Sequence, residues 1–383
     1  MRSFIIVIIG VAFFKTTFCV ADERIWLKAK INGKPVHLAF DSGSSGSALC
    51  QQTVQRLGLK FIPAPTNNLQ RGLLAGDTED CTLTLEGADS EVSFLVLDLP
   101  AYVFTDTDFD GLIGWWSLSQ NVMRIDATAR ELTFLSEVPK ETTQWTRLSI
   151  VALTNSGALD LQIPHSDRTN GILHIDTGSG FGFAMPTQAW HQWKAAHSKA
   201  PITLTTDFTP DDGFFVREEA WADEITIGPV VLKDVPIAQA GPAGSIRWGV
   251  QYEGTFGLAA LKRLDFIVDG NNSLAYLRAK GTGPPAYPHN RLGAIFVPTS
   301  THTNQAVADV VNESPAYVAG VRNGDVLLQV DDIVVTSWSG SWRSRFCMPA
   351  GTKLKLKLKR DGKTFTTTAT LREILQPSSD RKY

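Results

Sequence analysis

Two stretches of the sequence decide the fold. Residues 36–45 read Val-His-Leu-Ala-Phe-Asp-Ser-Gly-Ser-Ser, and residues 171–180 read Gly-Ile-Leu-His-Ile-Asp-Thr-Gly-Ser-Gly. In each stretch an apolar run with strand character leads into an aspartate, a hydroxyl residue, a glycine and a serine. Asp176 follows Asp41 by 135 positions, so the chain carries two copies of one motif.

The repeat continues downstream of each motif. Residues 110–114 read Asp-Gly-Leu-Ile-Gly, and residues 253–257 read Glu-Gly-Thr-Phe-Gly. Asp126 and Asp269 each follow the last glycine of these segments by twelve residues, and a strand-like segment comes after each. Features that recur in the same order at a nearly constant offset indicate two related lobes. We interpret Asp126 and Asp269 as structural, because each lies in a turn before a strand.

The sequence around the motifs is rich in strand signals. Residues 92–99, 150–163 and 225–235 form alternating or continuous apolar runs, punctuated by Gly, Pro, Asn and Asp. Helical patterns are short and cover residues 51–57, 115–121 and 187–197. They are too few for a parallel sheet built from βαβ units, so we expect a mainly β protein.

The two Asp-Ser/Thr-Gly motifs, each followed by a hydrophobic–hydrophobic–glycine segment, resemble the aspartic proteases of the pepsin/retropepsin clan. The resemblance covers about residues 23–280, and Thr255 departs from the apolar residue expected there. It implies two acid-protease β-barrel lobes, closer to retropepsins fused in one chain than to pepsins. It also implies a polypeptide substrate, no cofactor and a monomeric protease unit. A homodimer of the retroviral kind is the weaker alternative, since one chain already holds both halves of the site.

Asp41 and Asp176 are the candidate catalytic residues. Two carboxylates a few ångströms apart cannot both ionise, so the ionised one takes a proton from a water while the protonated one donates to the scissile carbonyl. The resemblance implies that the hydroxyls of Ser42 and Thr177 tie the motif loops together and that Ser44 and Ser179 donate to the carboxylates. Gly43 and Gly178 allow the tight turns. Hydrogen bonds to an ionised carboxylate favour that form, so we expect an acidic activity optimum.

Other readings of the same residues stay open at this point. Each Asp-Ser/Thr-Gly tripeptide alone is also an ordinary turn, and a catalytically inactive, peptide-binding scaffold is the alternative function. Residues 71–77 and 212–215 are candidate flap hairpins, although the pepsin-type flap tyrosine has no counterpart in the first. His174 lies two residues before Asp176 and so on the same strand face. It either tunes the pair electrostatically or is a packed core histidine, and the Ala39 of the first copy favours the second reading.

The C-terminal region reads as a separate domain. Residues 288–383 hold 13 basic and 8 acidic side chains, net +5, whereas residues 22–287 hold 21 and 31, net −10. The order strand, Ser-Pro-Ala, short helix, Gly and Asn-Gly-Asp-Val-Leu over residues 306–331 resembles a bacterial-type PDZ domain, which binds an extended peptide at a sheet edge. The resemblance implies a small α+β fold and a loop for the peptide's C-terminal carboxylate, with binding residues Leu292, Gly293, Ala294 and Ile295. Alternating Lys and Leu at residues 353–359 predict a strand with one solvated face.

The N-terminal segment predicts export of the protein. Arg2, the apolar run at residues 4–14 and the small residues before Ala21 are typical of a cleaved signal peptide, which predicts a secreted or periplasmic protein without a stable membrane span. In that setting Cys50 and Cys81 are the candidate disulfide, and Cys347 is expected to be a free thiol. Near-neutral charge argues against a dedicated nucleic-acid binder, and the absence of a CxxC motif and of a His pair with helical zinc-site spacing argues against a structural metal.

These observations divide the chain. We expect a signal peptide at residues 1–21, protease lobes at 22–139 and 140–281, a linker at 282–289 and a PDZ domain at 290–376.

Overall fold

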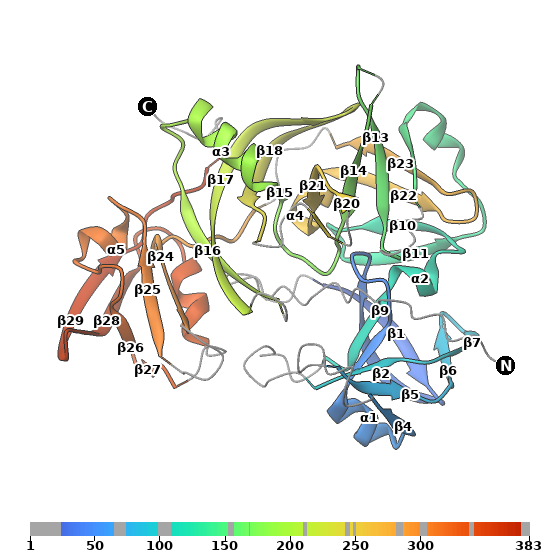
Figure 1. Cartoon of the computed structure of the whole chain (residues 1–383), viewed down its shortest axis with the longest axis horizontal. Helices are drawn as coiled ribbons and strands as arrows, with labels where there is room; N and C mark the ends of the chain where they lie inside the picture. Colours follow the sequence, from blue (N-terminus) through green and yellow to red (C-terminus); the bar gives the residue numbers. More distant parts are fainter. Residues whose placement is uncertain are drawn as a thin grey trace.

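The computed structural model is built mainly from strands (Figure 1). It describes residues 24–64, 74–98, 109–151, 157–167, 169–209, 213–241, 246–247, 250–280, 286–298, 305–336 and 341–376. The predicted signal peptide, residues 71–73 and Asp212 of the two predicted flaps, and residues 282–285 of the predicted linker lie outside these ranges. The expected mainly β class is confirmed.

Lobe 1 is built on a sheet whose described part has nine strands. The strands are β1 (Ile25–Ile31), β2 (Lys34–Asp41), β3 (Ala48–Cys50), β4 (Phe61–Pro63), β5 (Leu74–Thr78), β6 (Cys81–Leu85), β7 (Ala88–Val92), β8 (Leu95–Leu97) and β9 (Gly111–Gly114). Helix α1 (Gln51–Leu57) follows β3, and α2 (Trp115–Leu118) follows β9. Alternate residues of β1 are buried, as expected of a strand with one face on the core.

Lobe 2 repeats this construction with seven strands. They are β13 (Asp160–Pro164), β14 (Asn170–Ile175), β15 (Phe183–Met185), β16 (Thr203–Thr209), β17 (Gly213–Ile227), β18 (Val230–Gln239) and β21 (Gly254–Phe256). Helix α3 (Thr187–Ala196) follows β15, and α4 (Leu258–Leu261) follows β21; a small pair, β19 (Ile246–Arg247) and β20 (Val250–Gln251), lies before β21.

The two sheets follow the same path. Lobe 1 is ordered β4-β5-β8-β3-β9-β2-β1, with β6 and β7 added at the β1 edge, and lobe 2 is ordered β16-β17-β18-β15-β21-β14-β13. In both, the strand that carries the motif pairs in parallel with the strand of the downstream glycine segment. The repeat in the sequence is therefore a repeat in topology.

A third sheet joins the lobes. It contains β10 (Val122–Asp126), β11 (Glu131–Leu135), β12 (Thr146–Ser149), β22 (Leu264–Asp269) and β23 (Leu274–Ala279). The 3₁₀ helix η2 (Lys140–Gln144) precedes β12. Strand β10 of lobe 1 pairs with β22 of lobe 2. Asp126 accepts from the backbone N–H groups of Thr128 and Ala129, and Asp269 accepts from that of Asn272. Both carboxylates lie in turns, where they cap backbone groups.

The C-terminal domain is a small sheet with short helices. Its elements are β24 (Ala294–Pro298), β25 (Ala306–Val310), α5 (Pro315–Val318), β26 (Val326–Val330), β27 (Ile333–Val334), η3 (Ser341–Cys347), β28 (Lys353–Arg360) and β29 (Lys363–Thr370). Along β28 the leucines are buried and the lysines exposed, as the alternating pattern predicts. Figure 1 shows this domain beside the β16–β17 hairpin of lobe 2.

The cysteine predictions are wrong. Cys50 and Cys81 are both free, because β9, β2 and β1 lie between β3 and β6 in the sheet order. The Cys50 thiol faces the carbonyl oxygen of Phe109, whereas that of Cys81 faces the carbonyl oxygen of Val92. Cys347, expected to be a free thiol, is disulfide-bonded.

Candidate active site

The two motif aspartates occupy equivalent places at the ends of strands. Asp41 is the last residue of β2, and Asp176 directly follows β14. Both side chains are almost completely buried, with 3% and 2% of their surfaces exposed. The backbone N–H of Gly43 donates to the Asp41 carboxylate over 3.0 Å.

The glycines of the motifs bring the two aspartates together. A Cβ atom placed on Gly43 would lie 2.8 Å from Cγ of Asp176, and one placed on Gly178 would lie 2.6 Å from Cγ of Asp41. Each loop therefore packs its glycine directly on the carboxylate of the other lobe. A side chain at either position would push the carboxylates out of place.

The residues between aspartate and glycine lock the two loops to each other. The N–H of Ser42 donates to Oγ1 of Thr177 over 2.9 Å, and the N–H of Thr177 donates to Oγ of Ser42 over 3.1 Å. The hydroxyls in turn donate across the boundary, Ser42 to the carbonyl of Ile175 and Thr177 to the carbonyl of Phe40. This reciprocal set of bonds is the arrangement expected for Ser42 and Thr177.

The serines that follow the glycines behave differently from the expectation. The Ser44 hydroxyl donates to the backbone carbonyl of Gly46, and the buried Ser179 hydroxyl has no hydrogen-bond partner among the described residues. Neither donates to a carboxylate. Their backbone carbonyls instead anchor the downstream segments, since Ser44 accepts from the N–H of Trp115 and Ser179 from that of Leu258.

The downstream glycines are required by close packing under the motif loops. Asp41 lies opposite Gly114 in the parallel β2–β9 ladder. A Cβ atom on Gly114 would come within 2.8 Å of the Ser44 carbonyl oxygen, and one on Gly257 within 2.8 Å of the Ser179 carbonyl oxygen. The hydrophobic–hydrophobic–glycine segment is thus the support of each aspartate loop, which explains why the two motifs occur together.

Family comparisons agree with this geometry. The family model for aspartyl protease matches residues 27–115, and the model for the PDZ domain matches residues 291–371. The chain contains an aspartyl protease domain and a PDZ domain. The aspartyl protease model ends within lobe 1, so the equivalence of lobe 2 rests on the shared strand order and the paired motif loops.

The chain is also similar to parts of two solved structures. The crystal structure of the retroviral protease-like domain of Ddi1 from Leishmania major is 21% identical, and the match covers 31% of this chain and 98% of that one, with a TM-score of 0.25. Basic 7S globulin from soybean is 10% identical, with coverage of 70% and 95% and a TM-score of 0.39. No curated protein matches the sequence.

The loop of the PDZ domain that was expected to bind a peptide is buried. Leu292, Ala294 and Ile295 are fully covered. The side-chain oxygen of Asn290 accepts from the N–H groups of Leu292 and Gly293, over 3.0 and 3.2 Å. An amide oxygen of the chain itself thus occupies the place at which the resemblance puts a ligand carboxylate.

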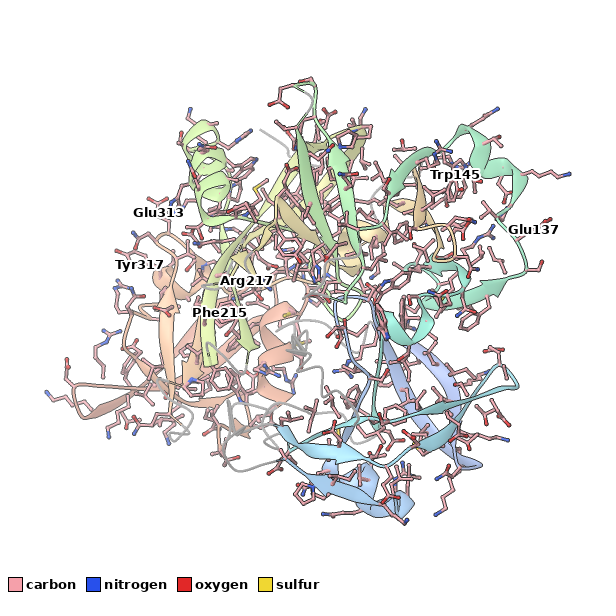
Figure 2. The ribbon with its side chains drawn as sticks, turned by 45° about the vertical axis from the view of Figure 1, so that its right-hand side comes forward. Glu137, Trp145, Phe215, Arg217, Glu313 and Tyr317 are labelled. Atoms are coloured by element: carbon pink, nitrogen blue, oxygen red, sulfur yellow. The ribbon has the colours of Figure 1, made fainter. Side chains whose placement is uncertain are left out.

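The same asparagine connects the PDZ domain to lobe 2. The side-chain NH₂ group of Asn290 donates to the backbone carbonyl of Leu204 on β16, and the backbone carbonyl of Asn290 accepts from the Thr203 hydroxyl. Leu204 belongs to the buried core of the PDZ domain, and Phe214 packs against that core. Figure 2 shows the neighbouring Phe215 and Arg217 on β17, on the side of lobe 2 next to the PDZ domain. The predicted second flap is therefore attached to the PDZ domain through Phe214.

The predicted linker contributes to this joint as well. Tyr287 is buried and donates its hydroxyl to Glu219 of β17 over 2.6 Å. It packs in a small apolar cluster with Trp221 and Ala259 of lobe 2 and with Ile374 and Leu375 beyond β29. The last residues of the predicted linker are thus part of the interface between lobe 2 and the PDZ domain.

The described residues show no grouping of His, Cys, Asp and Glu able to hold a metal ion. Within the same ranges no helix is long and apolar enough to cross a membrane.

His174 adds a feature that the motif alone does not contain. It is buried, and its Nδ1 atom lies 2.8 Å from a carboxylate oxygen of Asp160. Asp160 and Tyr252, which contacts the other carboxylate oxygen, were missed in the sequence. No local motif marks either residue in the sequence, because each becomes a neighbour of His174 only through strand pairing.

Proposed function

We propose that the chain is an aspartic endopeptidase in which Asp41 and Asp176 activate a water between them. One carboxylate takes a proton from the water, and the other, protonated, donates to the carbonyl oxygen of the scissile bond. The attack forms a tetrahedral intermediate, which collapses when the nitrogen leaves with a proton. The reciprocal packing of Gly43 on Asp176 and of Gly178 on Asp41 carries the proposal.

The proposal includes peptide recognition by the PDZ domain, since domains of this kind bind extended peptides. A peptide whose C-terminal carboxylate enters the loop must displace the side-chain oxygen of Asn290 from the N–H groups of Leu292 and Gly293. Because Asn290 also donates a hydrogen bond to the carbonyl of Leu204, such a peptide would disturb the contact between the PDZ domain and lobe 2.

We propose a monomeric protease unit, because one chain carries both aspartate motifs. We also propose that it is secreted or periplasmic, on the basis of the N-terminal segment. Mass measurement of the chain purified from the exported fraction would show cleavage after Ala21.

The test of the catalytic proposal is peptide-library cleavage from about pH 3 to about pH 8 by the wild-type chain, Asp41→Asn and Asp176→Asn. The wild type is expected to cleave best below neutrality, and each substitution should reduce kcat by a factor of about 10³ or more, because a dyad acts as a unit. Thermal melting shows whether the variants are folded. A folded wild-type chain that cleaves nothing over this range would overturn the proposal in favour of a peptide-binding scaffold.

A further inference from the structure

The two lobes differ at three equivalent positions behind the aspartates. In the β1–β2 ladder Trp26 lies opposite Ala39, and in the β13–β14 ladder Asp160 lies opposite His174. Phe109 and Tyr252 each precede the glycine that begins the downstream segment by two residues. Lobe 1 therefore has Trp26, Ala39 and Phe109 where lobe 2 has Asp160, His174 and Tyr252.

In lobe 1 these positions are apolar. The rings of Trp26 and Phe109 lie 6.1 Å apart in an edge-on contact, and Ala39 belongs to the same buried cluster. The guanidinium of Arg24 lies over both rings, 5.6 and 4.9 Å from their centres. The strand order and the motif loop are the same in the two lobes. Because lobe 1 forms them with apolar residues at the three positions, the fold does not require polar groups there.

In lobe 2 the same positions form a hydrogen-bonded chain. The Tyr252 hydroxyl donates to one oxygen of Asp160 over 3.1 Å, and His174 Nδ1 lies 2.8 Å from the other oxygen. Asp160 is fully buried and His174 is 2% exposed. The rings of His174 and Tyr252 are in edge-on contact at 5.5 Å. Burying a carboxylate and an imidazole is costly, and well-packed apolar residues are often as stable or more stable. Stability alone therefore does not account for the chain.

The His174 end of this chain faces Asp176. His174 Nε2 is buried and has no hydrogen-bond partner among the described residues. A Cβ atom on Gly43 would lie 3.0 Å from this nitrogen and 2.9 Å from Oδ1 of Asp176. The imidazole and the carboxylate thus border the same small space, which exists because residue 43 has no side chain.

We propose that His174 is a positioning residue that makes the two catalytic aspartates unequal, through the chain Tyr252–Asp160–His174 and the space beside Gly43. In this proposal the Nδ1–H group of His174 donates a hydrogen bond to Asp160. A second proton on Nε2 then makes the ring an imidazolium, whose Nε2 side faces Asp176. The titratable groups that face His174 are Asp160 at Nδ1, Tyr252 at the ring edge and Asp176 across Gly43. The positive charge of the imidazolium would attract the negative charge of the Asp176 carboxylate across this space. Asp176 is then the base that takes the proton from the water, and Asp41 is the acid that donates to the carbonyl.

This inference rests on the proposed endopeptidase function, and kinetics test it together with that function. His174→Ala installs the residue that lobe 1 carries, and Tyr252→Phe removes only the hydroxyl. We expect His174→Ala to lower kcat about tenfold or more with KM nearly unchanged. The acidic limb of its pH–rate profile should move relative to the wild type, because the charge facing Asp176 is gone, and Tyr252→Phe should move it less in the same direction. His191→Ala, on the exposed face of α3, is the control histidine and should leave the profile unchanged.

Nuclear magnetic resonance separates failure of the inference from failure of the proposed function. The ¹⁵N shifts of the His174 ring nitrogens are expected to differ between the wild type and Asp176→Asn, because the substitution removes a negative charge that faces Nε2. This readout does not need cleavage. The inference would be overturned if the His174 ring shifts were the same in the wild type and in Asp176→Asn. It would also be overturned if folded His174→Ala enzyme had the wild-type kcat and pH profile. Wild-type protein that cleaves nothing would instead count against the function.

Discussion

Ser42 and Thr177 join the two lobes by reciprocal hydrogen bonds beside Asp41 and Asp176. Each residue's N–H donates to the other's hydroxyl oxygen, over 2.9 and 3.1 Å, and each hydroxyl donates to a backbone carbonyl of the opposite lobe. All four bonds are buried, so no water replaces a lost partner. The relative position of Asp41 and Asp176 depends on these two side chains.

Removal of one hydroxyl from this set is expected to be costly. Thr177→Ala leaves the Ser42 N–H without an acceptor in a buried place, which should lower the free energy of unfolding by about 1–3 kcal/mol. Cleavage should fall as well, because the aspartates lose their alignment. Urea denaturation and kcat/KM measure the two effects. Thr177→Ser keeps the hydroxyl and is the matched control; equal losses in both variants would contradict the assigned role.

The motif glycines offer a sharper steric test. Gly43→Ala and Gly178→Ala place a Cβ atom 2.8 and 2.6 Å from Cγ of the facing aspartate. Because a displacement of about 1 Å at a reacting group can cost about 10²-fold in rate, we expect cleavage to fall by at least that factor. The measurement is kcat/KM beside the melting temperature.

The control for this pair is Gly87→Ala. Gly87 has a φ of +82° and open space around it, in the turn between β6 and β7. The substitution should lower stability by about 1 kcal/mol without an effect on kcat. Comparable loss of activity in Gly87→Ala would show that reduced stability, and not contact with the aspartates, explains the motif variants.

Asn290 is expected to compete with peptides at the PDZ loop. Asn290→Ala frees the N–H groups of Leu292 and Gly293, so a peptide with a free C-terminal carboxylate should bind about threefold to tenfold more tightly. Fluorescence anisotropy with the full chain measures the affinity, and the same peptide with an amidated C-terminus is the control. Equal affinities of the variant for both peptides would mean that this loop does not receive the carboxylate.

The thiols of lobe 1 should be unreactive while the protein is folded. Burial, together with the charge of Asp110 and against the smaller effect of Arg24, raises the pKa of the Cys50 thiol to about 12. Burial also raises the pKa of Cys81. Since the thiolate is the reactive form, only about 10⁻⁴ of Cys50 is reactive at a pH of about 8. Reactivity should rise as pH increases toward that pKa.

Alkylation followed by mass spectrometry checks this prediction. Cys50 and Cys81 should be modified slowly in native protein and at once in denaturant without reductant, because neither is in a disulfide. If labelling of Cys50 and Cys81 in denaturant required reductant, the two residues would form a disulfide, and the prediction would be wrong.

The sequence by itself determined the parts of this protein that depend on local pattern. Asp41 and Asp176, their glycines and the downstream segments recur in register, and the alternation of Leu and Lys in β28 marks its two faces. Such features follow from the period of a strand and from the steric needs of a tight turn, which neighbouring residues specify. The family resemblance for the protease and PDZ domains was confirmed for the same reason.

Only the tertiary structure decided which distant groups meet. Asp160 and Tyr252 become partners of His174 through the pairing of β13 with β14 and of β14 with β21. Asn290 meets the loop of its own domain and β16 of lobe 2 together, and Cys50 and Cys81 are kept apart by the intervening strands. Each of these contacts depends on strand order and domain docking, which arise from the burial of many side chains at once, and no short stretch of sequence encodes them.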